Sequence, residues 1–192
     1  MTRTPASAPA GIVLAAGASR RFAGGVKQLA DLRGRPLLSY AVEAMSAAVG
    51  DVIVVLGHAA GEISAAVDLG GARIVIAPDW DDGQSASLKR GVAAAADADA
   101  VAVTLGDQPF ITPAVIAGAL GQLEGFDAVR ATYDGVPGHP VVLSRPVMDA
   151  VAGLSGDTGA RDLLARFRVR KWEAGHLCSA ADIDTREELA QL

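Results

Sequence analysis

The chain of 192 residues has few aromatic side chains, one cysteine and no long apolar run. Aromatic residues make up 4% of it although 51% is hydrophobic, so alanine, valine and leucine must form most of the core. That composition favours a layered α/β structure over an all-β sandwich, which needs bulkier strand residues. Cys178 has no second cysteine as a partner, which excludes an internal disulfide and fits a reducing compartment.

Membrane segments and excess positive charge are also lacking. No stretch approaches the roughly 20 apolar residues of a membrane helix, and the opening MTRTPASAPA lacks the apolar core of a secretory signal. Lysine and arginine number 17 against 22 aspartate and glutamate, a net charge of −5, which argues against binding to nucleic acid or anionic membranes. We therefore expect a cytoplasmic protein whose phosphate sites, if any, are built from a few local cations.

Short apolar runs alternate with segments of helical periodicity after a Pro/Ala-rich tail at residues 1–10, which we expect to be disordered. The runs lack polar alternation, as in strands covered on both faces. Strands are predicted at Gly11–Ala16, Asp51–Leu56, Ala72–Ala77 and Ala100–Leu105, and helices at Pro36–Val49, Glu62–Asp68, Gln84–Ala96 and Pro113–Leu123. This βαβα order predicts one domain over residues 11–192, a Rossmann-like three-layer α/β sandwich with a mostly parallel sheet.

The alternation of predicted strands and helices becomes less regular beyond residue 123. Strands are predicted at Ala128–Tyr133, Pro140–Leu143 and Val169–Trp172, and helices at Arg145–Val151, at Thr158–Arg166 and from Thr185 onward. We interpret this last third as an irregular continuation of the same domain that forms a wall for the substrate.

The first predicted strand runs into the loop AGASRRFAGGVKQ, residues 16–28. Parallel sheets bind ligands at the carboxyl ends of their strands. Glycines let backbone N–H groups approach phosphate oxygens, and Arg20, Arg21 and Lys27 add positive charge. The spacing differs from GxGxxG and from GxxxxGK[ST], which disfavours a dinucleotide Rossmann site and a P-loop NTPase. The alternative is a surface loop with solvated basic side chains.

Two acidic segments offer candidate metal ligands. Asp107 in LGDQP follows the strand predicted at Ala100–Leu105, and magnesium prefers such oxygen ligands. The alternative is an ordinary turn residue. Near the C-terminus, DIDTREEL (residues 182–189) contains Asp182 and Asp184, of which we favour Asp184. The alternative is a helix cap formed by Asp184 or Thr185, and both roles can coexist.

The segment LAAGASRRFAGGVKQLADLRGRPLL, residues 14–38, resembles the opening signature of the MobA-like NTP transferases of molybdenum cofactor biosynthesis. It is most similar to their cytidylyltransferase branch, and the resemblance extends from residue 11 to about residue 190. It implies a nucleotide-diphospho-sugar transferase-like fold. It also implies a catalytic role for Lys27 and Arg20 at the triphosphate and nucleotide contacts from Leu14, Ala15, Ala16, Gly17, Arg20, Arg21 and Lys27.

Other segments resemble further parts of that family. GDQP resembles its metal-binding motif, which implies that Asp107 is catalytic and binds nucleotide and Mg²⁺, with Asp184 as second ligand. GQSASL resembles a nucleotide-contacting segment, which implies contacts from Ser85 and Ser87, although both could simply cap a helix. GHP and GDTGAR resemble segments lining the acceptor pocket. The implied acceptor-binding residues are Gln108, Gly138, His139, Pro140, Asp157 and Arg161.

The resemblance implies attack by a phosphate oxygen of molybdopterin on the α-phosphorus of CTP, with release of pyrophosphate and with a molybdoenzyme or its chaperone as partner. One alternative is the same reaction with GTP, although guanylyltransferases open with LAGG where this chain has LAAG. Another is a different phosphorylated acceptor, such as a sugar or polyol phosphate. A third is a nucleotide- or cofactor-binding chaperone without catalysis, against which the intact Lys27 and Asp107 argue. A glycosyltransferase is disfavoured because no DxD follows the fourth strand.

Overall fold

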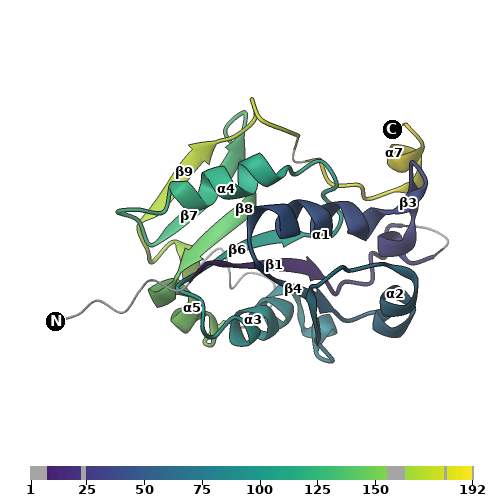
Figure 1. Ribbon diagram of the computed structural model, residues 1–192, viewed down its shortest axis with the longest axis horizontal. Helices are drawn as coiled ribbons and strands as arrows, with labels where there is room; N and C mark the ends of the chain where they lie inside the picture. The colour runs from purple at the N-terminus through teal and green to yellow at the C-terminus, as the bar shows by residue number, and fades with distance from the viewer. Residues whose placement is uncertain (1–7, 23–24, 155–162, 180, 192) are drawn as a thin grey trace.

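A seven-stranded sheet forms the centre of the molecule in the computed structural model, which describes residues 8–22, 25–154, 163–179 and 181–191 (Figure 1). The strand order is β5-β4-β1-β6-β8-β7-β9. Pairing is parallel except that β8 runs antiparallel to both of its neighbours. The predicted mostly parallel sheet is therefore confirmed. The strands are β1 Ala10–Ala15, β4 Asp51–Leu56, β5 Arg73–Ile76, β6 Ala100–Leu105, β7 Ala128–Tyr133, β8 Val136–Ser144 and β9 Val169–Glu173.

Helices cover both faces of this sheet, as the three-layer prediction requires. Figure 1 shows α1 and α4 above the sheet and α3 and α5 below it. Within the described residues, no helix has the length and apolar character needed to cross a membrane. The helices are α1 Leu37–Ala48, α2 Ala60–Ala66, α3 Gln84–Ala94, α4 Pro113–Gly121, α5 Arg145–Val151 and α7 Arg186–Ala190, with 3₁₀ turns η1 Lys27–Leu29 and η2 Trp80–Asp82.

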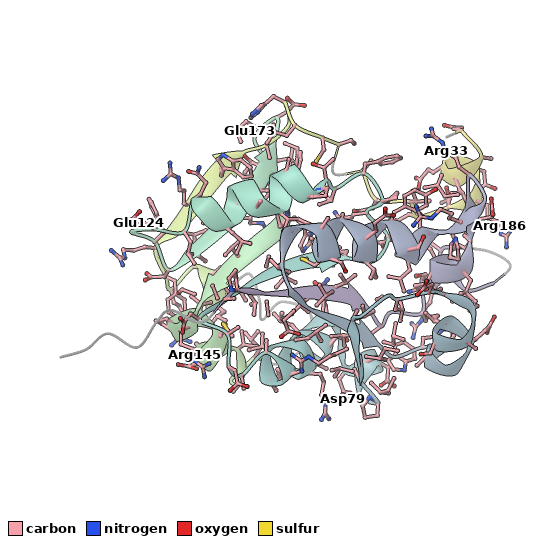
Figure 2. The ribbon with its side chains drawn as sticks, viewed as in Figure 1. Arg33, Asp79, Glu124, Arg145, Glu173 and Arg186 are labelled. Atoms are coloured by element: carbon pink, nitrogen blue, oxygen red, sulfur yellow. The ribbon has the colours of Figure 1, made fainter. Side chains whose placement is uncertain are left out.

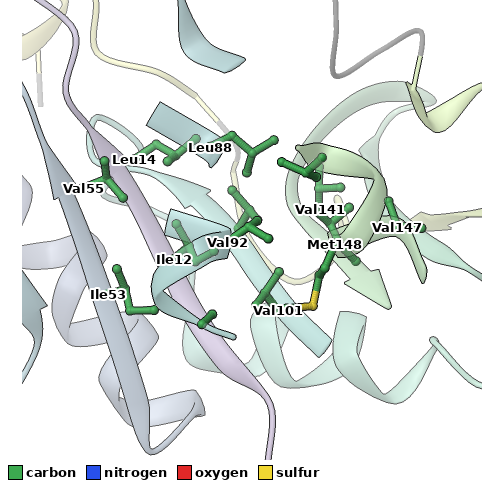
Figure 3. Close-up of a cluster of buried hydrophobic side chains, with 14 of the residues drawn as sticks. Ile12, Leu14, Ile53, Val55, Leu88, Val92, Val101, Val141, Val147 and Met148 are labelled. Atoms are coloured by element: carbon green, nitrogen blue, oxygen red, sulfur yellow. The ribbon is translucent and has the colours of Figure 1, made fainter. Parts of the chain in front are cut away.

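Both faces of strand β1 are buried, which explains why its sequence does not alternate between apolar and polar residues. Ile12 and Leu14 point into a cluster with Leu88 of α3 and Met148 of α5 (Figure 3). Val13 points the opposite way into a second cluster that contains residues of α1, α2 and α4. The end of β1 is thus fixed in position from two sides, which matters because the candidate site begins there.

Two hairpin connections were not predicted, and the first joins two very short strands. Strands β2 Asp31–Leu32 and β3 Arg35–Pro36 pair across Arg33 and Gly34, both with positive φ. A strand of two residues is too short to produce a hydrophobic periodicity that sequence analysis could detect.

The helix predicted at Thr158–Arg166 lies largely outside the described residues.

The second hairpin joins β7 and β8 through Asp134 and Gly135, with φ of 51° and 78°. Positive φ at both central residues is the geometry of a type I′ turn, for which Asp-Gly is a strong signal. Strand β8 therefore starts at Val136, and not at Pro140 as predicted. Because β8 is antiparallel to β6, with Val103 opposite Val141, the start of β8 lies beside the carboxyl end of β6.

Candidate active site

The Lys27 ammonium lies between two carboxylates that are distant in sequence. Its Nζ donates to Asp107 Oδ2 at 2.6 Å and to Asp184 Oδ1 at 3.0 Å. The other oxygen of Asp184, Oδ2, pairs with Arg21 Nη2 at 2.8 Å. The lysine side chain is only 5% exposed, whereas those of Asp107 and Asp184 are 26% and 27% exposed. The predicted convergence of the first loop, the end of β6 and the C-terminal segment is therefore observed.

Apolar packing brings the C-terminal segment to this position. Ile183 is buried in a cluster with Phe22, Leu32 and Leu37, next to the first loop. Its backbone N–H donates to the Asp107 carbonyl at 3.1 Å, and the Arg186 guanidinium lies 5.3 Å from the centre of the Phe22 ring. Figure 2 shows Arg186 at the end of the molecule that also carries Arg33 of the β2–β3 turn.

Helix α7 begins with a capping box that leaves Asp184 available to the site. Thr185 Oγ1 accepts from the backbone N–H of Glu188 at 3.2 Å, and Glu188 Oε2 accepts from the N–H of Thr185 at 3.1 Å. Of the two predicted candidates, Thr185 is therefore the cap. The carboxylate of Asp184 instead faces Lys27 and Arg21.

The charges of this cluster influence one another. Burial disfavours the Lys27 ammonium, but its contacts with Asp107 and Asp184 outweigh that effect and raise the pKa of Lys27 above its usual 10.5. The neighbouring Asp182 carboxyl has a raised pKa because of burial and because Asp107 and Asp184 repel its charge, although a hydrogen bond from Gln108 acts in the opposite direction. Three carboxyl groups thus share the region with Lys27 and Arg21, which favours an added cation.

The residues at this cluster fit a divalent metal. The Oδ1 atom of Asp107 is buried and has no hydrogen-bond partner among the described residues. Carboxylate oxygens are ligands that magnesium and manganese accept readily. In the part of the chain that the structure describes, no group of three or more His, Cys, Asp or Glu side chains is arranged to hold a metal. Substrate phosphates and water would therefore have to complete the coordination.

A pocket of about 200 Å³ opens at the carboxyl ends of the central strands. Of the predicted nucleotide-binding residues, Leu14, Ala15, Ala16, Gly17, Ser87 and Asp107 line it. A Cβ atom added to Gly17 would meet no atom of the described residues within 4 Å, so the space above this glycine is open to a ligand. The other lining residues were not predicted as nucleotide-binding from the sequence; they are Ser19, Gln28, Trp80, Gln84, Leu105 and Gly106.

The remaining predicted nucleotide-binding residues, Lys27 among them, are not among the described residues that line the pocket. Lys27 pairs with Asp107, which does line it. Arg20 is exposed, and the side chain of Arg21 is 78% exposed where it pairs with Asp184. Ser85 is buried in the first turn of α3 without being among the described residues that line the pocket. Contacts from Arg20, Arg21, Lys27 and Ser85 to a nucleotide stay predictions.

The amide of Gln28 fixes the first loop. Its Nε2 donates to the carbonyl of Ala15 at 3.2 Å and to that of Gly17 at 3.3 Å, and the residue is 7% exposed. These two carbonyls belong to the segment on which the pocket is built. Gln28 directly follows the predicted site residue Lys27, and this adjacency is the sequence feature that could have identified it as part of the site.

Replacing Gln28 with leucine is expected to leave the Ala15 carbonyl buried without this donor. Such a loss lowers the free energy of unfolding by about 1–3 kcal/mol. If the first loop makes the predicted nucleotide contacts, the substitution should also raise the KM for the nucleotide, because the loop is less firmly held. Thermal unfolding and initial rates measure both effects, with Gln122→Leu as the matched control outside the pocket. A Gln28→Leu protein with the wild-type melting temperature and KM would contradict this role.

The predicted acceptor residues fall into three groups. Gln108 is buried and its Nε2 donates to Asp182 Oδ1 at 2.6 Å, so it contacts the C-terminal segment. Gly138, His139 and Pro140 lie within β8, beside the carboxyl end of β6. Asp157 and Arg161 lie outside the described residues.

His139 has a defined environment at this edge of the sheet. Its carbonyl accepts from the Tyr133 hydroxyl at 2.6 Å. Desolvation, aided by the charge of Arg130, lowers the pKa of the His139 imidazole to about 4. The ring is therefore neutral near pH 7 and can contact an acceptor as a hydrogen-bonding group but not as a cation.

Comparison with known proteins identifies the relatives of this chain. Residues 11–172 match the MobA-like NTP transferase domain. Nicotine blue oxidoreductase of Paenarthrobacter nicotinovorans is 33% identical over 198 residues, which cover 95% of each chain. The crystal structure of Rv0371c from Mycobacterium tuberculosis H37Rv superposes with a TM-score of 0.87 at 31% identity, covering 98% of both chains. That of Rv0371c in complex with manganese gives 0.82 at 29% identity, covering 97% of this chain and 98% of the other.

The matches to nicotine blue oxidoreductase and to the two Rv0371c structures extend over nearly the whole chain. They confirm the predicted nucleotide-diphospho-sugar transferase-like fold. The family match spans well over half of the sequence and includes the strands β1 and β6 that carry the pocket. The chain belongs to the MobA-like NTP transferase family.

Proposed function

We propose that this protein transfers CMP from CTP to the phosphate of molybdopterin, with Mg²⁺ as the metal and pyrophosphate as the second product. The observation that carries the proposal is the position of Lys27, held between Asp107 and Asp184 beside a pocket formed by the LAAG segment. A lysine at this place offers a charge to a triphosphate, and two carboxylates offer ligands to its metal.

In the proposed reaction, a phosphate oxygen of the acceptor bonds to the α-phosphorus of CTP, and the bond from that phosphorus to the pyrophosphate oxygen breaks. Such a transfer depends mainly on positioning and charge neutralisation. Lys27 steadies the triphosphate and the departing pyrophosphate. Asp107 and Asp184 would hold the magnesium, which supplies Lewis-acid stabilisation of the phosphate oxygens. The buried Oδ1 of Asp107, which has no hydrogen-bond partner among the described residues, and the manganese complex of the relative Rv0371c support this assignment.

The acceptor approaches from the β8 side in this proposal. His139 and Pro140 lie there beside the end of β6, from which Asp107 extends. The neutral imidazole of His139 suits hydrogen bonding to the pterin rings better than pairing with the phosphate. The choice of CTP rests on the LAAG opening, and GTP is the closest alternative.

A redox role is the second candidate, because the relative that is 33% identical over 95% of both chains is named nicotine blue oxidoreductase. The lysine–carboxylate cluster favours nucleotidyl transfer, since hydride transfer needs no divalent metal held by carboxylates. Oxidation of NADH or NADPH by the purified protein with a quinonoid dye would favour the redox role.

The test is pyrophosphate release from CTP or GTP with molybdopterin, with and without Mg²⁺, followed by mass spectrometry of the product. We expect release that requires both the metal and the acceptor, a rate with CTP at least about tenfold above that with GTP, and a cytosine dinucleotide product. Equal or faster release with GTP would favour the guanylyltransferase, and release only with sugar or polyol phosphates would change the acceptor. Nucleotide binding without any release would favour a chaperone.

A further inference from the structure

We infer that Trp80 is the surface on which the base of the bound nucleotide stacks, an inference that rests on the proposed function. Trp80 is the only aromatic residue among the described residues that line the pocket. Its side chain is half-buried, so part of the indole packs on the core cluster below the sheet and part is open to the pocket. Aromatic rings with one free face are suited to stacking on nucleobases.

The topology separates Trp80 from the phosphate-binding side of the pocket. The end of β1 lies between the ends of β4 and β6 in the sheet. Trp80 packs on Gly57, which follows β4, whereas Asp107 follows β6. With the triphosphate at Lys27 and Asp107, a nucleotide that crosses the end of β1 would bring its base to the β4 side, where Trp80 lies.

Neighbouring residues hold the indole in this position. A Cβ atom at Gly57 would lie 2.5 Å from Trp80 Cβ and 2.8 Å from the Ala16 carbonyl oxygen, so only glycine allows this close approach. The His58 ring contacts the indole edge-on, with centroids 5.4 Å apart and planes at 77°. The backbone N–H of His58 donates to the Ala16 carbonyl at 2.9 Å. This bond links His58, which contacts Trp80, to the loop that follows β1.

The backbone of Trp80 is also held in place. Its N–H donates to Ala77 at 3.2 Å, and its carbonyl accepts from Gly83 at 3.3 Å. The preceding Asp79 accepts two hydrogen bonds of 3.2 Å from Arg90 of α3, and Figure 2 shows Asp79 on the α3 side of the molecule. An aromatic side chain fixed before the ligand arrives loses little entropy on binding.

Stacking on an indole discriminates weakly among bases, because every base has a π-face. Trp80 therefore contributes affinity to CTP and GTP alike. The choice between them must come from polar groups at the base edge, and Gln84 and Ser87 line the same pocket.

The chain offers a spectroscopic test because it has two tryptophans. Trp172 lies on β9, the strand at the opposite edge of the sheet from β5 and β4, and its ring packs against Gly118 of α4. In Trp172→Phe, only Trp80 emits. CTP, GTP and CMP should quench its fluorescence saturably, whereas tripolyphosphate, which has no base, should not. In Trp80→Phe, none of these ligands should change the emission of Trp172. If Trp172→Phe does not fold, the difference between wild type and Trp80→Phe gives the same measurement.

Kinetics supply the second readout. Trp80→Leu is expected to raise the KM for CTP at least about fivefold with kcat nearly unchanged, and Trp80→Phe should stay within about threefold of wild type. Inhibition by tripolyphosphate should be the same in all three proteins. Unchanged emission with every nucleotide, or a wild-type KM in Trp80→Leu, would overturn the inference. If nucleotides quench Trp80 but no acceptor gives pyrophosphate, the proposed transferase fails while the stacking site stands.

Discussion

Asp107→Asn is expected to keep the fold and to lose at least about a hundredfold in turnover, the scale of removing one main stabilising group of a transition state. Asparagine has nearly the same size and still accepts the hydrogen bond from Lys27. It lacks the negative charge of the proposed metal ligand, at the position where the buried Oδ1 has no partner among the described residues. Pyrophosphate release at saturating CTP and Mg²⁺ measures the effect.

Asp149→Asn is the matched control for this variant. Asp149 forms an exposed i,i+4 ion pair with Arg145 on α5, outside the pocket. The Asp149→Asn enzyme should therefore release pyrophosphate at the wild-type rate. If Asp107→Asn released pyrophosphate as fast as this control, Asp107 would not be the metal ligand of the reaction.

Lys27→Met is expected to lose activity on the same scale and to lose more stability than Asp107→Asn, in which Lys27 keeps Asp184 and a hydrogen-bond acceptor at position 107. Lys27 is the buried cation between Asp107 and Asp184, and methionine leaves the two carboxylates without it. Breaking a buried pair costs about 3–5 kcal/mol, and because both carboxylates are about a quarter exposed we expect roughly 2 kcal/mol, or about 4–8 °C in melting temperature.

Magnesium should raise the melting temperature of Lys27→Met more than that of the wild type, because the ion supplies the missing positive charge between the carboxylates. The control is Lys171→Met, an exposed lysine on β9, which should melt like the wild type. Thermal unfolding with and without Mg²⁺ gives the comparison. An unchanged melting temperature in Lys27→Met, or an equal response to Mg²⁺ in both proteins, would contradict the account of this cluster.

The pH dependence of the stability follows from the direction in which folding shifts the pKa of Lys27. The folded state raises the pKa of Lys27, so the stability that its pairing contributes is fully present below the ordinary value of 10.5. It is lost as pH rises through the raised pKa. The stability difference between wild type and Lys27→Met should therefore persist from neutral pH up to about pH 10.5.

The sequence predicted the strands β4, β6 and β7 well, because β4 and β6 are almost entirely apolar or β-branched and β7 is mostly so, with Arg130 as its charged residue. Their bounds are those predicted, and so are the bounds of α5. Strand β1 begins at Ala10, one residue before the predicted start. The pattern failed at β2 and β3, which are too short for periodicity, and at the start of β8, where the Asp-Gly turn decides the register.

The sequence predicted that Lys27 and Asp107 lie close together, because both follow strands of one parallel sheet, and the structure places them in contact. Asp184, which the family resemblance suggested, joins them. Their roles toward a nucleotide and a metal stay predictions. Gln28 and Trp80 were missed because their roles arise from tertiary contacts. Gln28 acts through carbonyls 11 and 13 residues away, and Trp80 is held by a glycine on another strand end. The solvated-loop alternative for the first loop is wrong for Lys27, which is buried, and describes Arg20, which is exposed.

A crystal structure with Mn²⁺ and a non-hydrolysable CTP analogue tests the central assignment most directly, through the anomalous signal of the metal. We predict a manganese peak bonded to Asp107 and Asp184, with the triphosphate against Lys27 and the cytosine on Trp80. A nucleotide bound elsewhere, with the Lys27–Asp107 pair intact and no metal beside it, would contradict the account.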